Sequence, residues 1–449
     1  MMLRHIGFDS TMRIVKDLIG KVDYLDIVEY SENTIEIAYR RGSLEINYSS
    51  PRVYALRFVK DYNWYIMSST DPSKLAKLST STVRLIESRV RKSRYKLEVD
   101  EKYIAKGKFI LTRSTSVDED KAIDLLYTLG SFVNEYSNGL ADLECILVHS
   151  IIRRSITPYY TMETAYEEKS VIELYINIVY DGGYTVVSSD FIGFLGSPSD
   201  IDLSILRPRI TSVIERAKSL HRAQKLGVLE RGLKHNVVLD STCSAALIHE
   251  VVHFLEADSP NKVKLNTKIL SDEVTIFDDP TVSWGFASSA FDDECIITKP
   301  KKLVEDGLVI EYLHTIESTY DIGEGTPGNA RGLFHKPKAL QSNIVVKPGD
   351  WRFEEMVEEV RRGYYVEGLI RAEIDSYGNI TIVPELAWVI ENGELKRPVK
   401  ISYLKLALPL LKKSIIGLGR EVRYRASYEK THRVCEYTPP MILTNVFIA

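Results

Sequence analysis

The sequence predicts an α+β chain of two parts. The N-terminal part (1–228) has a mixed antiparallel sheet and helices. The C-terminal part (229–449) is β-rich and has one helix whose side chains have the spacing of metal ligands. The chain has 449 residues, of which 44% are hydrophobic. This is enough for two or three packed cores, at roughly 150 residues per domain. In the first part, segments of period-2 apolar pattern alternate with helical segments, whereas after about residue 228 short strands are separated by Gly, Pro and Asp-Gly.

The strands and helices of the N-terminal part follow from local patterns. Period-2 alternation and β-branched or aromatic residues predict strands at 24–31, 34–41, 43–50, 53–59 and 106–114, and a further meander over 144–161 and 170–189 that turns at 181–183. Helices are predicted over 71–92, capped by Asp71 with Pro72 at the first position, over 118–137, and over 199–227, ending at Gly227. In the C-terminal part, Glu-Asp-Gly at 305–307 and Glu-Asn-Gly at 391–393 are typical hairpin turns.

The segment 243–258 contains the most informative pattern of the chain. Ala245 and Ala246 favour a helix there, and Ser241 or Thr242 is the expected cap. His249 and His253 are four residues apart, about 40° in azimuth and about one turn along the axis, so their imidazoles can converge on one metal ion.

Glu250 lies about 100° round the helix from His249, beside such a metal rather than on it. This is the division of labour in H-E-x-x-H zinc hydrolases, where two neutral imidazoles hold Zn²⁺, the metal lowers the pKa of a water molecule, and the Glu acts as general base. The alternative is a buried helix whose histidines bond to the backbone or to each other. That alternative would place many ionisable groups in a core without a metal, which is costly.

A catalytic zinc needs a third protein ligand, and the pattern leaves several open. Glu256 faces the histidine side of the helix, as a ligand or as an acceptor that orients an imidazole N–H, whereas Asp258 points away. The remote candidates are Cys295, Cys435, His314, His335 and His432.

Charge and composition argue against several classes of protein. Lys and Arg number 58 against 62 Asp and Glu, a net charge of −4 that gives no reason to expect nucleic-acid or anionic membrane binding. The first twenty residues are too charged for an export signal, and no apolar run reaches the ~18 residues of a membrane span. Four scattered cysteines do not make a disulfide framework. We therefore expect a soluble, cytoplasmic protein.

Residues 230–449 resemble the TldD/PmbA family of metalloproteases, and specifically its active TldD-type subunit. The matching segments occur in the family's order and spacing: LIHEVVHFLEAD (247–258), FDDP (277–280), FDDEC (291–295), KLVEDGLVIEYL (302–313), GTPGNARG (325–332), SNIVVKPGD (342–350), IENGELKRPVK (390–400) and RVCEY (433–437). The first half is similar only in layout.

The resemblance implies a C-terminal metalloprotease domain with a zinc-binding helix and an N-terminal domain for the substrate channel or dimerisation. One Zn²⁺ per chain would be held by His249, His253 and Cys435, with Glu250 as the catalytic base. Cys295 falls where the family usually has Gly, and is interpreted as a packed substitution. The expected reaction is hydrolysis of unfolded or short peptides, with peptide-precursor maturation as a specialised task. The expected partner is a TldE/PmbA-like paralogous subunit, or a second copy of this chain.

The segment 325–332 is interpreted as a loop near the cleft, with Asn329 and Arg331 contacting peptide backbone, or otherwise simply as a turn. The chain departs from the family pattern in two places. The family helix usually has one more residue between the histidines, and Cys435 is followed there by Gly-Lys rather than by Glu436 and Tyr437. Two alternatives stay open: a non-catalytic scaffold subunit that retains zinc, and a structural zinc site in which Glu256 is the fourth ligand.

Overall fold

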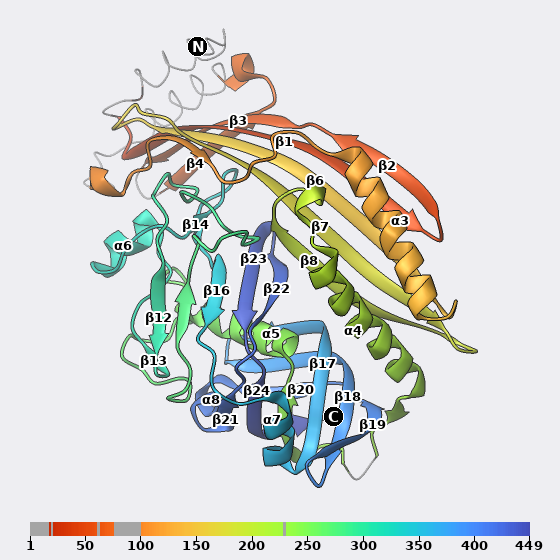
Figure 1. Ribbon diagram of the computed structural model, residues 1–449. Coiled ribbons are helices and arrows are strands. Elements are labelled where there is room, and N and C mark those ends of the chain that lie inside the picture. Colours follow the sequence, from red (N-terminus) through yellow and green to blue (C-terminus); the bar gives the residue numbers. More distant parts are fainter. Residues whose placement is uncertain (1–17, 19–20, 61–62, 76–99, 228–229) are drawn as a thin grey trace.

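The computed structural model describes residues 18, 21–60, 63–75, 100–227 and 230–449. The protein is strand-rich α+β, as predicted, and a long curved sheet of the N-terminal half arches over the sheets of the C-terminal half (Figure 1).

Eight strands form the N-terminal sheet, in the order β4-β3-β1-β6-β7-β5, with β2 pairing on β1 and β8 on β7. Neighbours are antiparallel except β5 and β7. The strands are β1 (Tyr24–Arg40), β2 (Ser43–Ser49), β3 (Arg52–Lys60), β4 (Asn63–Ser69), β5 (Gly107–Ile110), β6 (Ala141–Pro158), β7 (Ala165–Asp181) and β8 (Thr185–Leu195). The two strands predicted over 24–31 and 34–41 are one strand, because Glu32 and Asn33 between them still pair with Ile152 and Ile151 of β6. The predicted turn at 181–183 is confirmed.

Two helices pack on one face of this sheet, α3 (Glu119–Tyr136) and α4 (Leu203–Arg222), and their apolar sides share a core with β1, β6 and β7. The side chain of Asp118 caps α3, and that of Asp202 caps α4. The prediction that the second helix runs to Gly227 is wrong. Ala223 is extended (φ −68°, ψ 129°), and the chain then enters β9 (Gln224–Lys225). The helix predicted over 71–92 starts after Asp71, whose Oδ1 accepts the N–H of Ser73 at 2.9 Å, and the remainder from 76 lies outside the described residues.

The larger C-terminal sheet has the strand order β17-β10-β24-β20-β18-β19-β9, with β21 on β24. Because β17 also pairs with β18, five of these strands close into a ring. The strands are β10 (Lys234–Leu239), β17 (Arg362–Ile374), β18 (Asn379–Glu391), β19 (Glu394–Lys400), β20 (Leu404–Ala407), β21 (Ile415–Leu418) and β24 (Met441–Ile448). The short β9 pairs with β19, so this sheet takes in residues ahead of position 228.

A second C-terminal sheet has the order β13-β12-β11-β16-β23-β22. Its strands are β11 (Ile276–Asp278), β12 (Lys301–Glu305), β13 (Leu308–Val309), β16 (Asn343–Val346), β22 (Arg423–Glu429) and β23 (His432–Thr438). The other elements are η1 (Glu101–Tyr103), η2 (Pro198–Asp200), α5 (Ser241–Val252), η3 (His253–Leu255), α6 (Ile316–Ile322), β14 (Ala330–Arg331), β15 (Lys338–Ala339), α7 (Phe353–Val360) and α8 (Leu408–Ser414). Both predicted hairpin turns, at 305–307 and 391–393, are confirmed.

The two halves share apolar and charged contacts. Phe286, Ala426 and Cys435 of the C-terminal half pack against Ile152, Val171 and Leu195 of the N-terminal sheet. Beside them, the guanidinium of Arg154 donates to a carboxylate oxygen of Asp293 at 2.5 Å, and both residues are buried. Among the described residues, no helix combines the length and apolar character that crossing a membrane requires.

Candidate metal centre

Helix α5 carries the predicted histidines and lies between the closed ring of strands and the β22–β23 hairpin (Figure 1). Its cap is Asp240 rather than the expected Ser241 or Thr242. Asp240 Oδ1 accepts the N–H of Cys243 at 2.7 Å, and Oδ2 accepts that of Gly368 in β17 at 3.0 Å, so one carboxylate both starts the helix and fixes it to the sheet. Leu247, Ile248, Val251 and Val252 are fully buried in the core of the C-terminal half.

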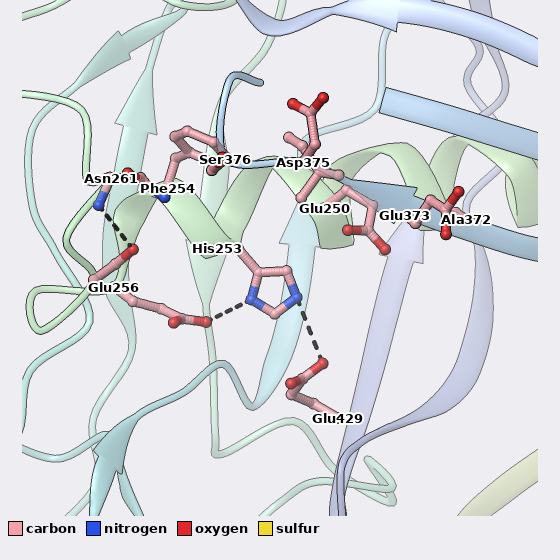
Figure 2. A pocket seen from close by; sticks show the side chains of 12 residues that line it. Glu250, His253, Phe254, Glu256, Asn261, Ala372, Glu373, Asp375, Ser376 and Glu429 are labelled. Atoms are coloured by element: carbon pink, nitrogen blue, oxygen red, sulfur yellow. Dashed lines mark hydrogen bonds and ion pairs between the residues drawn. The ribbon is translucent and has the colours of Figure 1, made fainter. Parts of the chain in front are cut away.

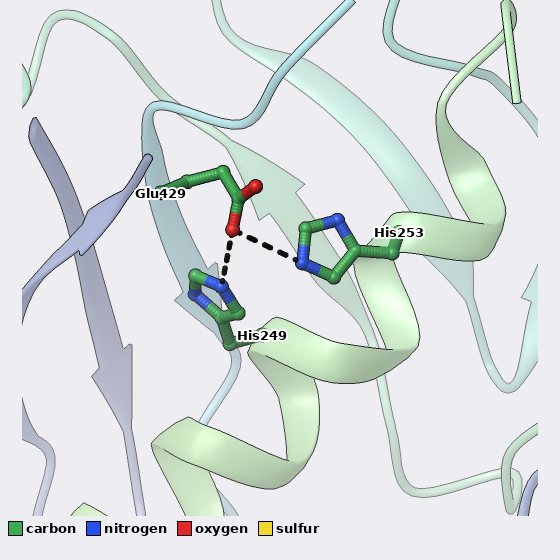
Figure 3. Close-up of side chains that lie close together, drawn as sticks. All are labelled: His249, His253 and Glu429. Carbon is green, nitrogen blue, oxygen red and sulfur yellow. Dashed lines mark ion pairs between the residues drawn. The ribbon is translucent and has the colours of Figure 1, made fainter. Parts of the chain in front are cut away.

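The two imidazoles converge, as their spacing predicts. His249 is buried and His253 is half-buried, and their ring centroids are 5.1 Å apart. Facing both is the carboxylate of Glu429, at the end of β22 (Figure 3). Its Oε2 lies 3.6 Å from Nε2 of His249 and 3.5 Å from Nε2 of His253. Among the described residues, these three make up the group of His, Cys, Asp and Glu side chains whose ligand atoms lie close enough together to hold a metal ion.

The spacing of these three atoms fits a metal better than it fits hydrogen bonding. Two ligand atoms at about 2.1 Å from a tetrahedral zinc ion lie about 3.4 Å apart. An N–H···O hydrogen bond has a donor–acceptor distance of about 2.9 Å. The distances of 3.5 and 3.6 Å from Glu429 Oε2 to the two Nε2 atoms are close to the spacing expected between two zinc ligands. Two imidazoles and one carboxylate are also a set of ligands that zinc accepts.

The other nitrogen of each ring is held by a second carboxylate. His249 Nδ1 lies 2.6 Å from Glu436 Oε1, and His253 Nδ1 lies 2.6 Å from Glu256 Oε1. Of its two expected roles, Glu256 therefore has that of the acceptor that orients an imidazole. It contacts the ring nitrogen of His253 that faces away from Glu429. With Nδ1–H donating to a carboxylate, each Nε2 keeps its lone pair for the metal.

Without a metal, the same carboxylates favour protonated histidines. Burial lowers the pKa of His253, but Glu256 and Glu429 outweigh it and raise that pKa to about 10. The two imidazoles in turn hold the pKa of Glu429 well below its usual range. A metal ion entering this site must displace protons from the rings.

The structure places Cys435, the third ligand implied by the family resemblance, away from the histidines. Along β23, side chains alternate between the two faces of the hairpin. Since Glu436 points toward His249, Cys435 points toward the N-terminal sheet, where it packs on Phe286 and Ala426. Burial among these side chains raises the pKa of its thiol to about 12. The carboxylate that faces both imidazoles is instead that of Glu429.

Glu250 lines a pocket of about 390 Å³ together with His253 and Glu429 (Figure 2). Burial raises the pKa of its carboxyl group above the usual value. A carboxylate next to a metal site with an elevated pKa is suited to accept a proton from water. The pocket is lined by Glu250, His253, Phe254, Glu256, Ser259, Asn261, Ala372, Glu373, Ile374, Asp375, Ser376 and Glu429.

Asn329 and Arg331 are not among the residues that line this pocket. Asn329 Nδ2 donates to Asp278 Oδ2 at 2.6 Å, and Arg331 Nη1 donates to the carbonyl of Ala330 at 2.9 Å. Both side chains are buried. Cys295 is buried between the two halves, as the packed residue that was expected, and has a left-handed backbone (φ 66°).

Sequence reasoning missed Glu429 and Glu436. The signal that could have found them is the alternation in 423–438, where two strands of period 2 flank a short turn. In that register Glu429 pairs with His432, and Arg425 pairs with Glu436, so all four share the face that looks toward α5.

The C-terminal half of the chain is similar in sequence to known proteins. Residues 233–449 match the family model of the PmbA/TldA metallopeptidase C-terminal domain. A metalloprotease from Methanocaldococcus jannaschii is 36% identical over 177 residues, which are 37% of this chain and 39% of that protein. A metalloprotease from Methanothermobacter thermautotrophicus is 24% identical over 431 residues, 93% of this chain and 92% of that protein.

The likeness extends to the fold of the whole chain. The crystal structure of TldE from Thermococcus kodakarensis superposes with a TM-score of 0.78 at 17% identity, covering 99% of this chain and 100% of that one. The two histidines of α5 lie within the matched residues, and the C-terminal half of the chain, residues 233–449, belongs to the PmbA/TldD family of metallopeptidases.

Proposed function

We propose that this protein is a zinc-dependent peptidase that hydrolyses unfolded or short peptides, with one zinc ion held by His249, His253 and Glu429. The observation that carries the proposal is the convergence of both Nε2 atoms and one carboxylate oxygen within 4.8 Å of one another, beside a pocket that contains Glu250. When bound, zinc supplies Lewis acidity to the scissile carbonyl and makes nearby water more acidic.

Glu250 is the general base of the proposed reaction. Its carboxylate takes a proton from the attacking water and returns it to the leaving amine as the peptide bond breaks. Burial supports the first step, because a carboxylate whose pKa is raised is a stronger base toward water. The pocket volume of about 390 Å³ lies within the range of small-ligand pockets, about 300–1,000 Å³.

The proposed partner is a TldE/PmbA-like chain or, failing that, a second copy of this chain. The fold shared with TldE supports a paralogous pair, because two chains of one fold can meet through equivalent surfaces. Peptide hydrolysis is therefore best measured with the chain alone and with such a partner added.

Replacing Glu250 by Gln tests the catalytic role. The variant should retain about one zinc per chain and lose at least about 100-fold in kcat on an unstructured peptide, since general-base catalysis contributes about 10²–10⁴-fold. Elemental analysis and a peptide-cleavage assay are the two readouts, and Glu373→Gln, at the rim of the same pocket, is the matched control. Full activity in Glu250→Gln would refute the role of Glu250. Zinc binding without cleavage in the wild-type complex would favour the scaffold alternative.

A further inference from the structure

The carboxylate of Glu436 connects the metal-binding helix to a strand far along the chain. Its Oε1 lies 2.6 Å from Nδ1 of His249, although the two residues are 187 positions apart. The side chain is fully buried, and it is held in place by Ser427 Oγ at 2.8 Å and by Arg425 Nη1 at 3.1 Å, both from β22.

This contact determines which ring nitrogen of His249 carries hydrogen. A neutral imidazole has one N–H and one lone pair, and an ionised carboxylate can only accept. Gln341 Nε2 also approaches Nδ1, at 2.9 Å, but Nδ1 cannot donate to Glu436 and accept from Gln341 at once. The shorter contact, to a charged acceptor, makes Nδ1 the donor, and the lone pair is then on Nε2, the atom that faces Glu429.

The two histidines differ in how they are held. His253 is oriented by Glu256, three residues away in the same turn, so that contact forms with the helix end itself. His249 depends on β23, which must be docked against α5 before Glu436 can reach the ring.

We propose that Glu436 is the positioning residue of the metal centre: by accepting the Nδ1 hydrogen of His249, it fixes the tautomer and orientation of that ligand and thereby sets the metal affinity of the site. This inference rests on the proposed function, since it assumes that His249 is a zinc ligand. It also gives a role to the position after Cys435, where this chain departs from the family pattern.

The test is the zinc affinity of the full chain, measured by competition with a chromophoric chelator. Glu436→Ala should bind zinc about 10–100-fold more weakly than the wild type. Glu436→Gln, whose amide oxygen still accepts a hydrogen bond, should recover part of that loss. The control is Glu367→Ala, which removes a partly buried carboxylate of the same half that accepts from Trp388 Nε1 at 2.8 Å.

The outcomes separate the two proposals. An affinity of Glu436→Ala within about twofold of the wild type, or an equal loss in Glu367→Ala, would overturn the positioning role and leave the metal centre intact. A wild-type chain that binds no zinc would overturn the proposed function itself. Should Glu436→Ala fail to fold, as judged by circular dichroism of the metal-free protein, Glu436→Gln alone decides: a wild-type affinity together with an unchanged spectrum of the cobalt-substituted protein would overturn the proposal.

Discussion

Three carboxylates surround the two imidazoles at the candidate metal centre, and they lie near different ring nitrogens. Glu256 and Glu436 bind the Nδ1 atoms at hydrogen-bond distance, whereas Glu429 stands off from both Nε2 atoms at 3.5 and 3.6 Å. Position relative to the ring, rather than residue type, therefore separates the candidate ligand from the orienting residues.

Cys435 and Glu436 are neighbours on β23 and face opposite sides of the hairpin. Cys435 was expected at the metal because of its sequence neighbourhood, but a strand turns successive side chains to opposite faces. Once Glu436 faces His249, Cys435 must face the N-terminal sheet, and its apolar neighbours there suit a neutral thiol.

The β22–β23 hairpin is the element that joins the metal centre to the N-terminal half. One face carries Glu429 and Glu436 toward α5. From the other face, Arg433 Nη2 lies 2.9 Å from Glu173 Oε1 in β7, and Tyr428 donates to the same oxygen at 2.6 Å. The N-terminal sheet thus supports the strands that bring carboxylates to the histidines.

Removing the cation of this contact should destabilise the protein. In Arg433→Ala, the carboxylate of Glu173, only 4% exposed, would lose its charged partner. Breaking a buried pair in this way costs about 3–5 kcal/mol. The free energy of unfolding in urea is the measurement. The control is Arg40→Ala, whose ion pair with Glu144 is exposed and loosely spaced at 4.0 Å, and an equal loss in both variants would contradict the account.

At the level of elements, the sequence predicted what depends on near neighbours. Period-2 patterns located most strands of the N-terminal sheet, and the turns at 181–183, 305–307 and 391–393 followed from Gly with Asp or Asn. The four-residue spacing of His249 and His253 predicted their convergence. Strand pairing could not be predicted in the same way, because it depends on contacts distant in sequence. For that reason β1 was divided into two strands, and Glu429 was missed.

At the scale of the whole molecule, buried neutral histidines make stability depend on pH, because protonating them opposes folding. Burial lowers the pKa of His149 to about 4, and that of His314 also to about 4. In the unfolded chain both should titrate near the ordinary value of about 6.5. Between these values the unfolded state binds more protons than the native state, so stability falls as pH falls from about 6.5 to about 4, by up to about 1.4 kcal/mol per pH unit for each group.

Replacing His149 by Gln should therefore make the free energy of unfolding depend less on pH in the acid range. We expect the loss of unfolding free energy between pH 7 and pH 5, measured by urea denaturation in the presence of a chelator, to be smaller in His149→Gln than in the wild type. His335→Gln, at an exposed histidine, is the control and should keep the wild-type slope. If the slope of His149→Gln matched that of the control, the buried neutral histidine would not be the cause.

Two histidines of α5 and Glu429, which faces them, are the proposed zinc ligands. Elemental analysis of zinc per chain in the wild type, Glu429→Gln and Cys435→Ala tests this assignment most directly. We expect about one zinc per chain in the wild type and in Cys435→Ala, and a greatly reduced zinc content in Glu429→Gln. Zinc lost from Cys435→Ala but retained in Glu429→Gln would contradict it.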